Sequence, residues 1–187
     1  MRGTAARDDT FANGVPESYL RSAIPIPDPR SRFPMLTSDT LRTLADERQI
    51  IDCIIRLCVA TDSRDWATAR ACFADVVRFD MTSLAGGEPA DVPAEQIIAG
   101  WTEGLAPMEA VHHHLGNFRV TIRGDEAEAF CYGTAYHYRR TASGRNTRTF
   151  VGSYDFALVR ADDAWRINAF RFNVKFVDGN LDLENDG

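Results

Sequence analysis

Apolar residues in the first part of the chain recur with the period of an amphipathic helix. Within TSDTLRTLADERQIIDCIIRLCVATD, residues 37–62, they return every three or four positions, and Thr37 or Ser38 is suited to cap the first turn. WATARACF and EQIIAGWTEGLA are predicted to form two further helices, with Asp65 as the N-cap of the helix that begins at Trp66. VVRFDM alternates as a strand does, and SLAGGEPADVPA after it is predicted to be a loop.

The second part of the chain alternates between apolar and polar residues instead. Four long stretches have this pattern: HHHLGNFRVTIRG, EAEAFCYGTAYHYRR, TRTFVGSYDFALVRA and AWRINAFRFNVKFV. Turn-forming residues separate them, in GDE, TASGRN and ADDA. Helices followed by a meander of long strands predict an α+β fold in which a curved sheet curls over the helices. The concave side of such a sheet is either a small-molecule pocket or a filled core.

The two ends of the chain differ in composition from this central region. Residues 1–36 are proline-rich and contain apolar residues such as Ile24 and Phe33, so they are predicted to be an extended arm or a disordered leader. Such an arm would lie over its own domain or over a partner subunit. Residues 37–178 are predicted to form one domain, and residues 179–187 an acidic tail.

Composition and charge exclude several classes of function. The 187 residues are 44% hydrophobic and 26% charged, which is typical of a soluble globular chain. A net charge of −6 argues against nucleic-acid binding, which needs a basic face, and the arginines of HYRRTASGRNTR are interpreted as a solvated hairpin. No stretch has the length of a signal peptide's apolar core or of a membrane span, so a cytoplasmic protein without membrane contact is expected.

The sequence contains no recognisable cofactor motif. The four cysteines show no CxxC spacing and are interpreted as buried, reduced thiols. There is no glycine-rich phosphate loop, no dinucleotide fingerprint and no Ser-His-Asp order. No cofactor is therefore expected.

Three stretches together resemble one known family. ATDSRDWATARACFADVVRFD, HHHLGNFRVTIRGDEAEAFCYGTAYHY and VGSYDFALVRADDAWRI are similar, in order and spacing, to the SnoaL-like branch of the nuclear transport factor 2-like superfamily. This branch includes polyketide cyclases, scytalone dehydratase, bile acid 7α-dehydratase and hexachlorocyclohexane dehydrochlorinase. The resemblance covers roughly residues 40 to 178 and implies a cone-shaped, mixed or antiparallel sheet wrapped around N-terminal helices. One such cone hosts many reactions, so the fold alone does not name the reaction.

In the dehydratase-like members, an Asp at the end of the first helix pairs with a His at the start of a later strand. TDSRDW contains two aspartates, and the family's position, four residues before the tryptophan, is Asp62. The matching histidine, four residues before an asparagine, is His113, and that asparagine is Asn117. The resemblance implies that His113 is a general base, that Asp62 orients it, and that Asn117 donates to a substrate oxygen. Each residue also has a structural alternative. His113 could be a histidine with its hydrogen bonds made inside the protein, Asp62 could cap the turn after the helix, and Asn117 could bond to a neighbouring loop.

The chain departs from the family pattern at Cys58, where related enzymes carry a tyrosine one helical turn before the Asp. If the reaction needs a phenol to polarise a substrate carbonyl, the phenol must come from elsewhere. The candidates are Tyr132, Tyr136 and Tyr154, each of which could equally serve packing.

The run of three histidines allows two interpretations. Alternation gives two strand faces, with His113, Leu115, Asn117 and Arg119 on one and His112, His114, Gly116, Phe118, Val120 and Ile122 on the other. His112 and His114 could bind a metal only with a third ligand, such as His137 or Asp155, and nothing in the spacing demands it. No metal site is expected.

The last predicted strand raises a similar choice. Strict alternation places Trp165, Ile167, Ala169, Arg171, Asn173 and Lys175 on one face and Phe170, Phe172, Val174 and Phe176 on the other. The aromatic row is interpreted as core or subunit interface. Arg171 is predicted to hold a substrate carboxylate or oxyanion, or else to form a salt bridge with Asp155.

These observations predict a cofactor-independent lyase or isomerase, of dehydratase or cyclase type, acting on a small apolar substrate that bears a carbonyl or hydroxyl group. The alternative is a non-catalytic ligand-binding or assembly subunit, resembling the β subunit of ring-hydroxylating dioxygenases. A homo-oligomer, dimer or trimer, is expected because the outer sheet face would leave an aromatic row to cover. The sequence identifies neither the substrate nor the choice between dehydration, cyclisation and double-bond migration.

Overall fold

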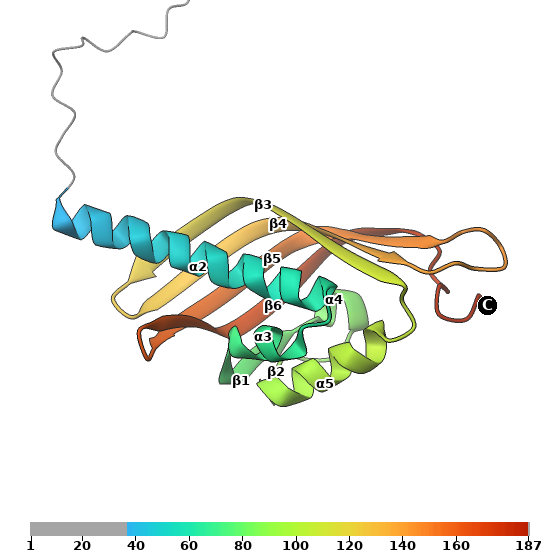
Figure 1. Ribbon diagram of the computed structural model, residues 1–187, viewed down its shortest axis with the longest axis horizontal. Helices are drawn as coiled ribbons and strands as arrows, with labels where there is room; N and C mark the ends of the chain where they lie inside the picture. The colour runs from blue at the N-terminus through green and yellow to red at the C-terminus, as the bar shows by residue number, and fades with distance from the viewer. Residues whose placement is uncertain (1–36, 187) are drawn as a thin grey trace, which may run out of the picture. The chain divides into compact units, whose positions relative to one another are not determined.

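The computed structural model describes residues 37–186, and the predicted proline-rich arm, residues 1–36, lies outside the described residues. Within the described part, a mixed six-stranded sheet is accompanied by helices, the longest of which runs along the sheet (Figure 1). The helices are α2 (Ser38–Asp62), α3 (Trp66–Ala71), α4 (Thr82–Ala85) and α5 (Ala94–Leu105). The strands are β1 (Phe73–Asp80), β2 (Ala90–Pro93), β3 (Ala110–Arg123), β4 (Glu126–Tyr138), β5 (Thr147–Ala161) and β6 (Ala164–Gly179).

The strands lie in the order β2-β1-β6-β5-β4-β3. Neighbours are antiparallel except for β1 and β6, which pair in parallel. The predicted α+β class and mixed, curved sheet are therefore confirmed. The prediction that SLAGGEPADVPA is a loop was wrong in part. This stretch contains most of α4 and the whole of β2, and β2 pairs with β1. A strand as short as β2 is stabilised by pairing with its neighbour, and its sequence is too short for alternation to predict a strand.

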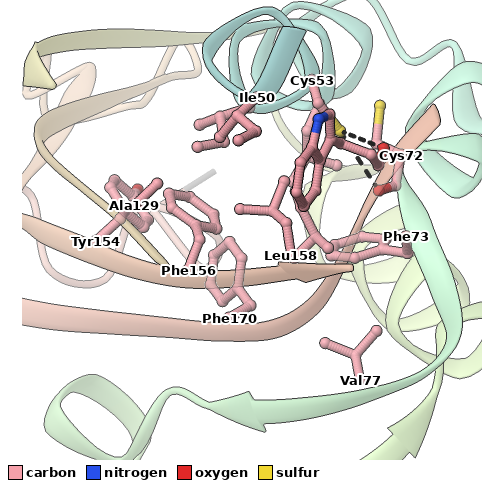
Figure 2. Close-up of a cluster of buried hydrophobic side chains, with 14 of the residues drawn as sticks. Ile50, Cys53, Cys72, Phe73, Val77, Ala129, Tyr154, Phe156, Leu158 and Phe170 are labelled. Atoms are coloured by element: carbon pink, nitrogen blue, oxygen red, sulfur yellow. Dashed lines mark hydrogen bonds between the residues drawn. The ribbon is translucent and has the colours of Figure 1, made fainter. Parts of the chain in front are cut away.

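One apolar core joins α2 to the sheet. Figure 2 shows Ile50 and Cys53 of α2 facing Phe156, Leu158 and Phe170 of the sheet, all of them buried. Burying a side chain of this size contributes roughly 1.5–3 kcal/mol. The predicted helical face holds in the second half of α2, where the buried residues gather. It does not hold at the start, where Leu41 and Leu44 are exposed.

An irregularity in β3 changes which of its residues face the core. The pairing with β4 shifts between Gly116 and Arg119, so β3 holds one extra residue there. Asn117, at φ 58°, lies in the left-handed conformation that such a bulge uses and that Asn tolerates. The predicted faces of β3 were therefore wrong beyond the bulge. Leu115, Phe118, Val120 and Ile122 pack against the core together.

A second irregularity, in β6, has the same effect. Ile167 pairs with Leu158 whereas Ala169 pairs with Ala157, so Asn168 is an extra residue on β6. Strict alternation was again wrong, because four residues that it separates are all buried: Trp165, Ile167, Phe170 and Phe172. The interpretation of the aromatic row as core holds for Phe170 and Phe172, whereas Phe176 is exposed.

The end of the chain folds back on the sheet. Strand β6 runs to Gly179, and residues 181–185 form turns. Leu183 in these turns is fully buried and packs with Met108 and Val111. No helix within residues 37–186 is long and apolar enough to cross a bilayer.

Candidate active site

Asp62 is the last residue of α2, and the turn that follows it is anchored to the segment before β3. Arg64, at φ 56°, makes this turn possible. Its guanidinium donates to the carbonyl oxygens of Met108 and, at 3.3 Å, of Leu105. Asp65 then caps α3, as predicted, by accepting from the amide of Thr68 at 3.1 Å. The end of α2 is thereby held next to the start of β3.

His113 lies on β3 and is bound twice by the Asp62 carboxylate. The His113 backbone N–H donates to Oδ2 at 2.8 Å, and His113 Nδ1 lies 2.6 Å from Oδ1. The backbone bond is available because β3 is an edge strand, whose outward N–H groups have no strand partner. The two side chains are only 15% and 16% exposed. The sequence-predicted pair is thus in direct contact.

This contact determines what the His113 ring can do. An ionised carboxylate only accepts hydrogen bonds, so Nδ1 carries the proton that faces Asp62. In the neutral ring Nε2 is then the basic nitrogen, and it has no hydrogen-bond partner among residues 37–186. If Nε2 takes a proton, the adjacent carboxylate stabilises the imidazolium. The arrangement is that of a general base with an orienting acid.

His113 borders an apolar cavity of about 190 Å³ between the helices and the sheet. Asp62 does not line the cavity, so it lies behind the histidine rather than beside a bound molecule. The lining comes from α2, α4, α5 and the four strands β3 to β6, together with Met81: Leu57, Cys58, Thr61, Met81, Leu84, Trp101, Leu105, His113, Ala135, His137, Phe150, Tyr154, Phe170 and Phe172. Such a site binds an apolar molecule and orients it through a few polar atoms.

Tyr154 is the only one of the three predicted tyrosines that lines this cavity. Its side chain is buried, and its ring lies against Phe156 and Phe172. Burial raises the pKa of Tyr154, so the phenol keeps its proton and remains a donor. Its hydroxyl has no hydrogen-bond partner in the described part of the chain. Gly133 makes room for the ring, because a Cβ there would lie 2.2 Å from Tyr154 Cε2.

Tyr132, Tyr136 and Asn117 lie away from the cavity. Both tyrosines are 44% exposed, on the face of β4 opposite Cys131 and Ala135, which are buried. Asn117 is exposed at the bulge of β3. The structure thus brings Asp62, His113 and Tyr154 together and leaves these three predicted residues, Asn117, Tyr132 and Tyr136, outside this site.

Arg171 also lies outside the cavity, in a groove on the other face of the sheet. Its guanidinium Nε donates to Asp80 Oδ2 at 2.7 Å. The predicted alternative, a salt bridge to Asp155, was wrong, since Asp155 instead accepts from Asn173 at 2.7 Å. Arg171 of β6 lies opposite Asp155 of β5, as it does opposite Asp80 of β1 on the other side. The guanidinium binds Asp80, and the pairing of β1 with β6 was not predicted.

Cys58 lines the cavity at the position where a tyrosine was expected. Burial, and to a lesser degree the nearby Asp62 carboxylate, raise the pKa of the thiol, so it stays protonated and weakly polar. His112 and His114 are both exposed on β3. No group of three or more His, Cys, Asp or Glu side chains within residues 37–186 could hold a metal ion.

His137 is a pocket residue that the sequence did not identify as such. It was considered only as a third metal ligand, yet it lines the cavity from β4. Burial, reinforced by the guanidinium of Arg148, lowers the pKa of His137 to about 4, so the ring is neutral at pH 7. The signal was available in the predicted hairpin, because alternation from Cys131 and Ala135 places His137 on the same face.

Comparisons with known proteins place this geometry in a family. Residues 42–171 match the model of the SnoaL-like domain. None of the curated proteins matches the chain. Among solved structures, the Kfla4162 protein of Kribbella flavida is similar, with a TM-score of 0.72 and 25% identity over 76% of this chain and 98% of that one.

Two similar structures come from Novosphingobium aromaticivorans. A protein named as a candidate aromatic ring hydroxylase has a TM-score of 0.65 and 26% identity, over 76% of this chain and 98% of that one. A protein named as a candidate scytalone dehydratase has a TM-score of 0.65 and 16% identity, over 74% and 90%. The second likeness shows the shared fold.

Proposed function

We propose that this chain, which belongs to the family of SnoaL-like domains, is a cofactor-independent lyase of dehydratase type. One observation carries the proposal: Asp62 binds both the backbone and the ring of His113, and the other ring nitrogen is free beside an apolar cavity. His113 is the general base, Asp62 orients it, and Tyr154 donates a hydrogen bond to the substrate.

The reaction follows from these three groups. His113 Nε2 takes a proton from the carbon next to a carbonyl group, and the electrons of that C–H bond move toward the carbonyl, which the Tyr154 hydroxyl polarises. The carbonyl then re-forms as the bond between the β-carbon and its hydroxyl group breaks. The imidazolium of His113 returns the proton to the departing hydroxide, which leaves as water. Positioned proton transfer of this kind is worth about 10²–10⁴-fold in rate.

The cavity indicates the class of substrate. A cavity of about 150 Å³ lined by apolar side chains holds one benzene molecule, so about 190 Å³ suits one ring with small substituents. The described lining residues include no Lys or Arg, and the Asp62 carboxylate lies just behind His113. An anionic substrate would be repelled and unpaired here. We therefore propose a neutral, single-ring β-hydroxy carbonyl compound as the substrate class.

The test is to incubate the protein with a panel of such compounds in D₂O and to follow both water loss and deuterium at the α-carbon by NMR. We expect turnover or α-exchange by the wild type, and loss of at least 100-fold in His113→Gln. The exposed neighbour His112→Gln is the matched control and should retain the rate. Equal rates in wild type and His113→Gln would contradict the proposal.

A second candidate function is a non-catalytic assembly subunit. The sequence suggests it through the resemblance to the β subunit of ring-hydroxylating dioxygenases, and one similar structure, at 26% identity, is named as a candidate aromatic ring hydroxylase. Native mass spectrometry separates the two candidates. The lyase is expected as a homo-oligomer of this chain alone, whereas a subunit is expected to form a stable complex with a different, iron-binding chain.

A further inference from the structure

The second pocket histidine, His137, has a different hydrogen-bond environment from His113. It pairs across the β4–β5 hairpin with Arg148, and Arg148 Nη2 lies 3.4 Å from His137 Nδ1. A guanidinium has only donors, so Nδ1 must accept and cannot carry a proton. A neutral imidazole has one N–H group, which here belongs to Nε2. The two cavity histidines thus hold opposite tautomers.

Arg148 is itself held by the end of the chain. Its guanidinium forms a two-point ion pair with Glu184, Nη1 donating to Oε2 at 2.8 Å and Nη2 to Oε1. The Arg148 side chain is 14% exposed and that of Glu184 33%. Two-point pairing fixes the plane of a guanidinium as well as its position. The Arg148 guanidinium therefore contacts His137 in a fixed orientation.

The segment that carries Glu184 is anchored independently. Leu183, its neighbour, is fully buried, and Arg139 donates to the backbone carbonyl oxygens of Leu183 and Glu184. Glu184 lies within residues 179–187, which were predicted to be an acidic tail. This segment thus places one carboxylate next to the only cation that contacts His137 among the described residues.

The charges around His137 keep its ring neutral. Partial burial disfavours a charged ring, and protonation would also place a second cation beside Arg148; together these lower the pKa of His137 to about 4. The remaining titratable groups that act on the ring are His113, which opposes protonation when charged, and Glu184 and Asp62, which favour it. The neutral donor therefore persists across the range from about pH 5 to 8.

We propose that Arg148 and Glu184 are positioning residues that hold His137 as a neutral imidazole with its proton on Nε2, a fixed hydrogen-bond donor for the substrate. This inference rests on the proposed function. The oxygen it serves is the substrate carbonyl oxygen, which gains negative charge when His113 removes the adjacent proton. A neutral imidazole can polarise such an oxygen without surrendering its own proton. The site then combines one accepting histidine with one donating histidine.

The experiment is long-range ¹H–¹⁵N NMR of histidine-labelled full-length protein, which shows which ring nitrogen carries the proton. In the wild type we expect His137 with the proton on Nε2 and no titration above about pH 5. In Arg148→Met we expect a mixture of tautomers and a pKa that moves from about 4 toward the ordinary value of 6.5. Glu184→Gln should give a smaller loss of the Nε2–H tautomer.

Arg123→Met is the matched control, because it removes an exposed guanidinium that pairs with Glu128 elsewhere on the sheet. It should leave His137 unchanged. A wild-type His137 with its proton on Nδ1, or an unchanged tautomer in Arg148→Met, would overturn the inference, and the wild-type spectrum decides even if a variant fails to fold. His113 appears in the same spectra. If only His137 departs from expectation, the inference fails and the proposed function survives. If only His113 departs from expectation, the proposed function is contradicted, whereas the tautomer assigned to His137 still stands.

Discussion

The two faces of the sheet carry the same kinds of side chain in different surroundings. Tyr154, on the inner face that α2 covers, is buried, whereas Tyr132, on the outer face, is 44% exposed. The His113 side chain is 15% exposed and that of His112, one residue away, 70%. The residue type is therefore a weak guide to chemistry here. What distinguishes a reactive side chain from a solvated one is its burial beside the cavity and, for His113, the Asp62 carboxylate that fixes its ring.

The largest effect is expected at the Asp62–His113 pair. Asp62→Asn cannot stabilise the imidazolium, so kcat for turnover or α-proton exchange should fall by about 10²–10⁴. Asp155→Asn changes a carboxylate on the outer face in the same way and should leave kcat unchanged. Steady-state kinetics of the two variants, side by side, measure the contrast. A similar fall in both variants would show that the inner face has no special role.

The next effect is expected from the tyrosines. Tyr154→Phe removes a single donor from the cavity, and the loss of one such donor to a developing oxyanion typically costs about 10²–10³ in kcat. Tyr132→Phe removes an exposed hydroxyl and should change kcat by less than about twofold. A larger fall in kcat in Tyr132→Phe than in Tyr154→Phe would contradict the distinction between the two faces.

A smaller effect, on stability, is expected from the glycines. Gly133→Ala would place a Cβ 2.2 Å from the Tyr154 ring and 3.1 Å from Leu115, so it should lower the free energy of unfolding by about 1–3 kcal/mol. A Cβ at Gly116 meets nothing within 4 Å, and Gly116→Ala is the control. Urea denaturation of both variants measures the difference. Equal stabilities would mean that the Tyr154 ring does not depend on the space above Gly133.

The smallest effect is expected in the pH dependence of stability. The pKa of His137 is lowered to about 4 in the folded protein, against about 6.5 unfolded, so between these values the unfolded chain binds more protons. The His137 contribution to stability is then complete above about pH 6.5 and is lost as pH falls toward 4. It amounts to about 1.5 kcal/mol between pH 6.5 and 5. His137→Gln should flatten this slope, and His112→Gln should not.

The sequence predicted the parts of the molecule that depend on local pattern. The spacing of Ile50 and Ile54 is that of a buried helix face, and both residues are buried. The four long strands follow from simple alternation. The pair Asp62 and His113 was predicted from the family resemblance, and the two residues are in contact. For the helix and the strands a short stretch of sequence contains the signal, whereas the pair depends on a resemblance that spans most of the chain.

The parts that depend on register between distant strands were not predicted. The bulges at Asn117 and Asn168 reverse the faces of β3 and β6, and one extra residue is invisible to a count of alternating positions. Asp80 binds Arg171 because β1 and β6 are neighbours, which no local pattern states. His137 was underestimated for a similar reason, since its role depends on Arg148 across the hairpin.

The most direct test of the central claim is the protonation of the His113 ring, read by long-range ¹H–¹⁵N NMR in the wild type and in Asp62→Asn. The account predicts that in the wild type the proton of the neutral ring is on Nδ1, held by Asp62, and that this preference is lost in Asp62→Asn. A His113 ring that gives the same tautomer populations and the same titration in both proteins would show that the two residues are not coupled, and would contradict the account.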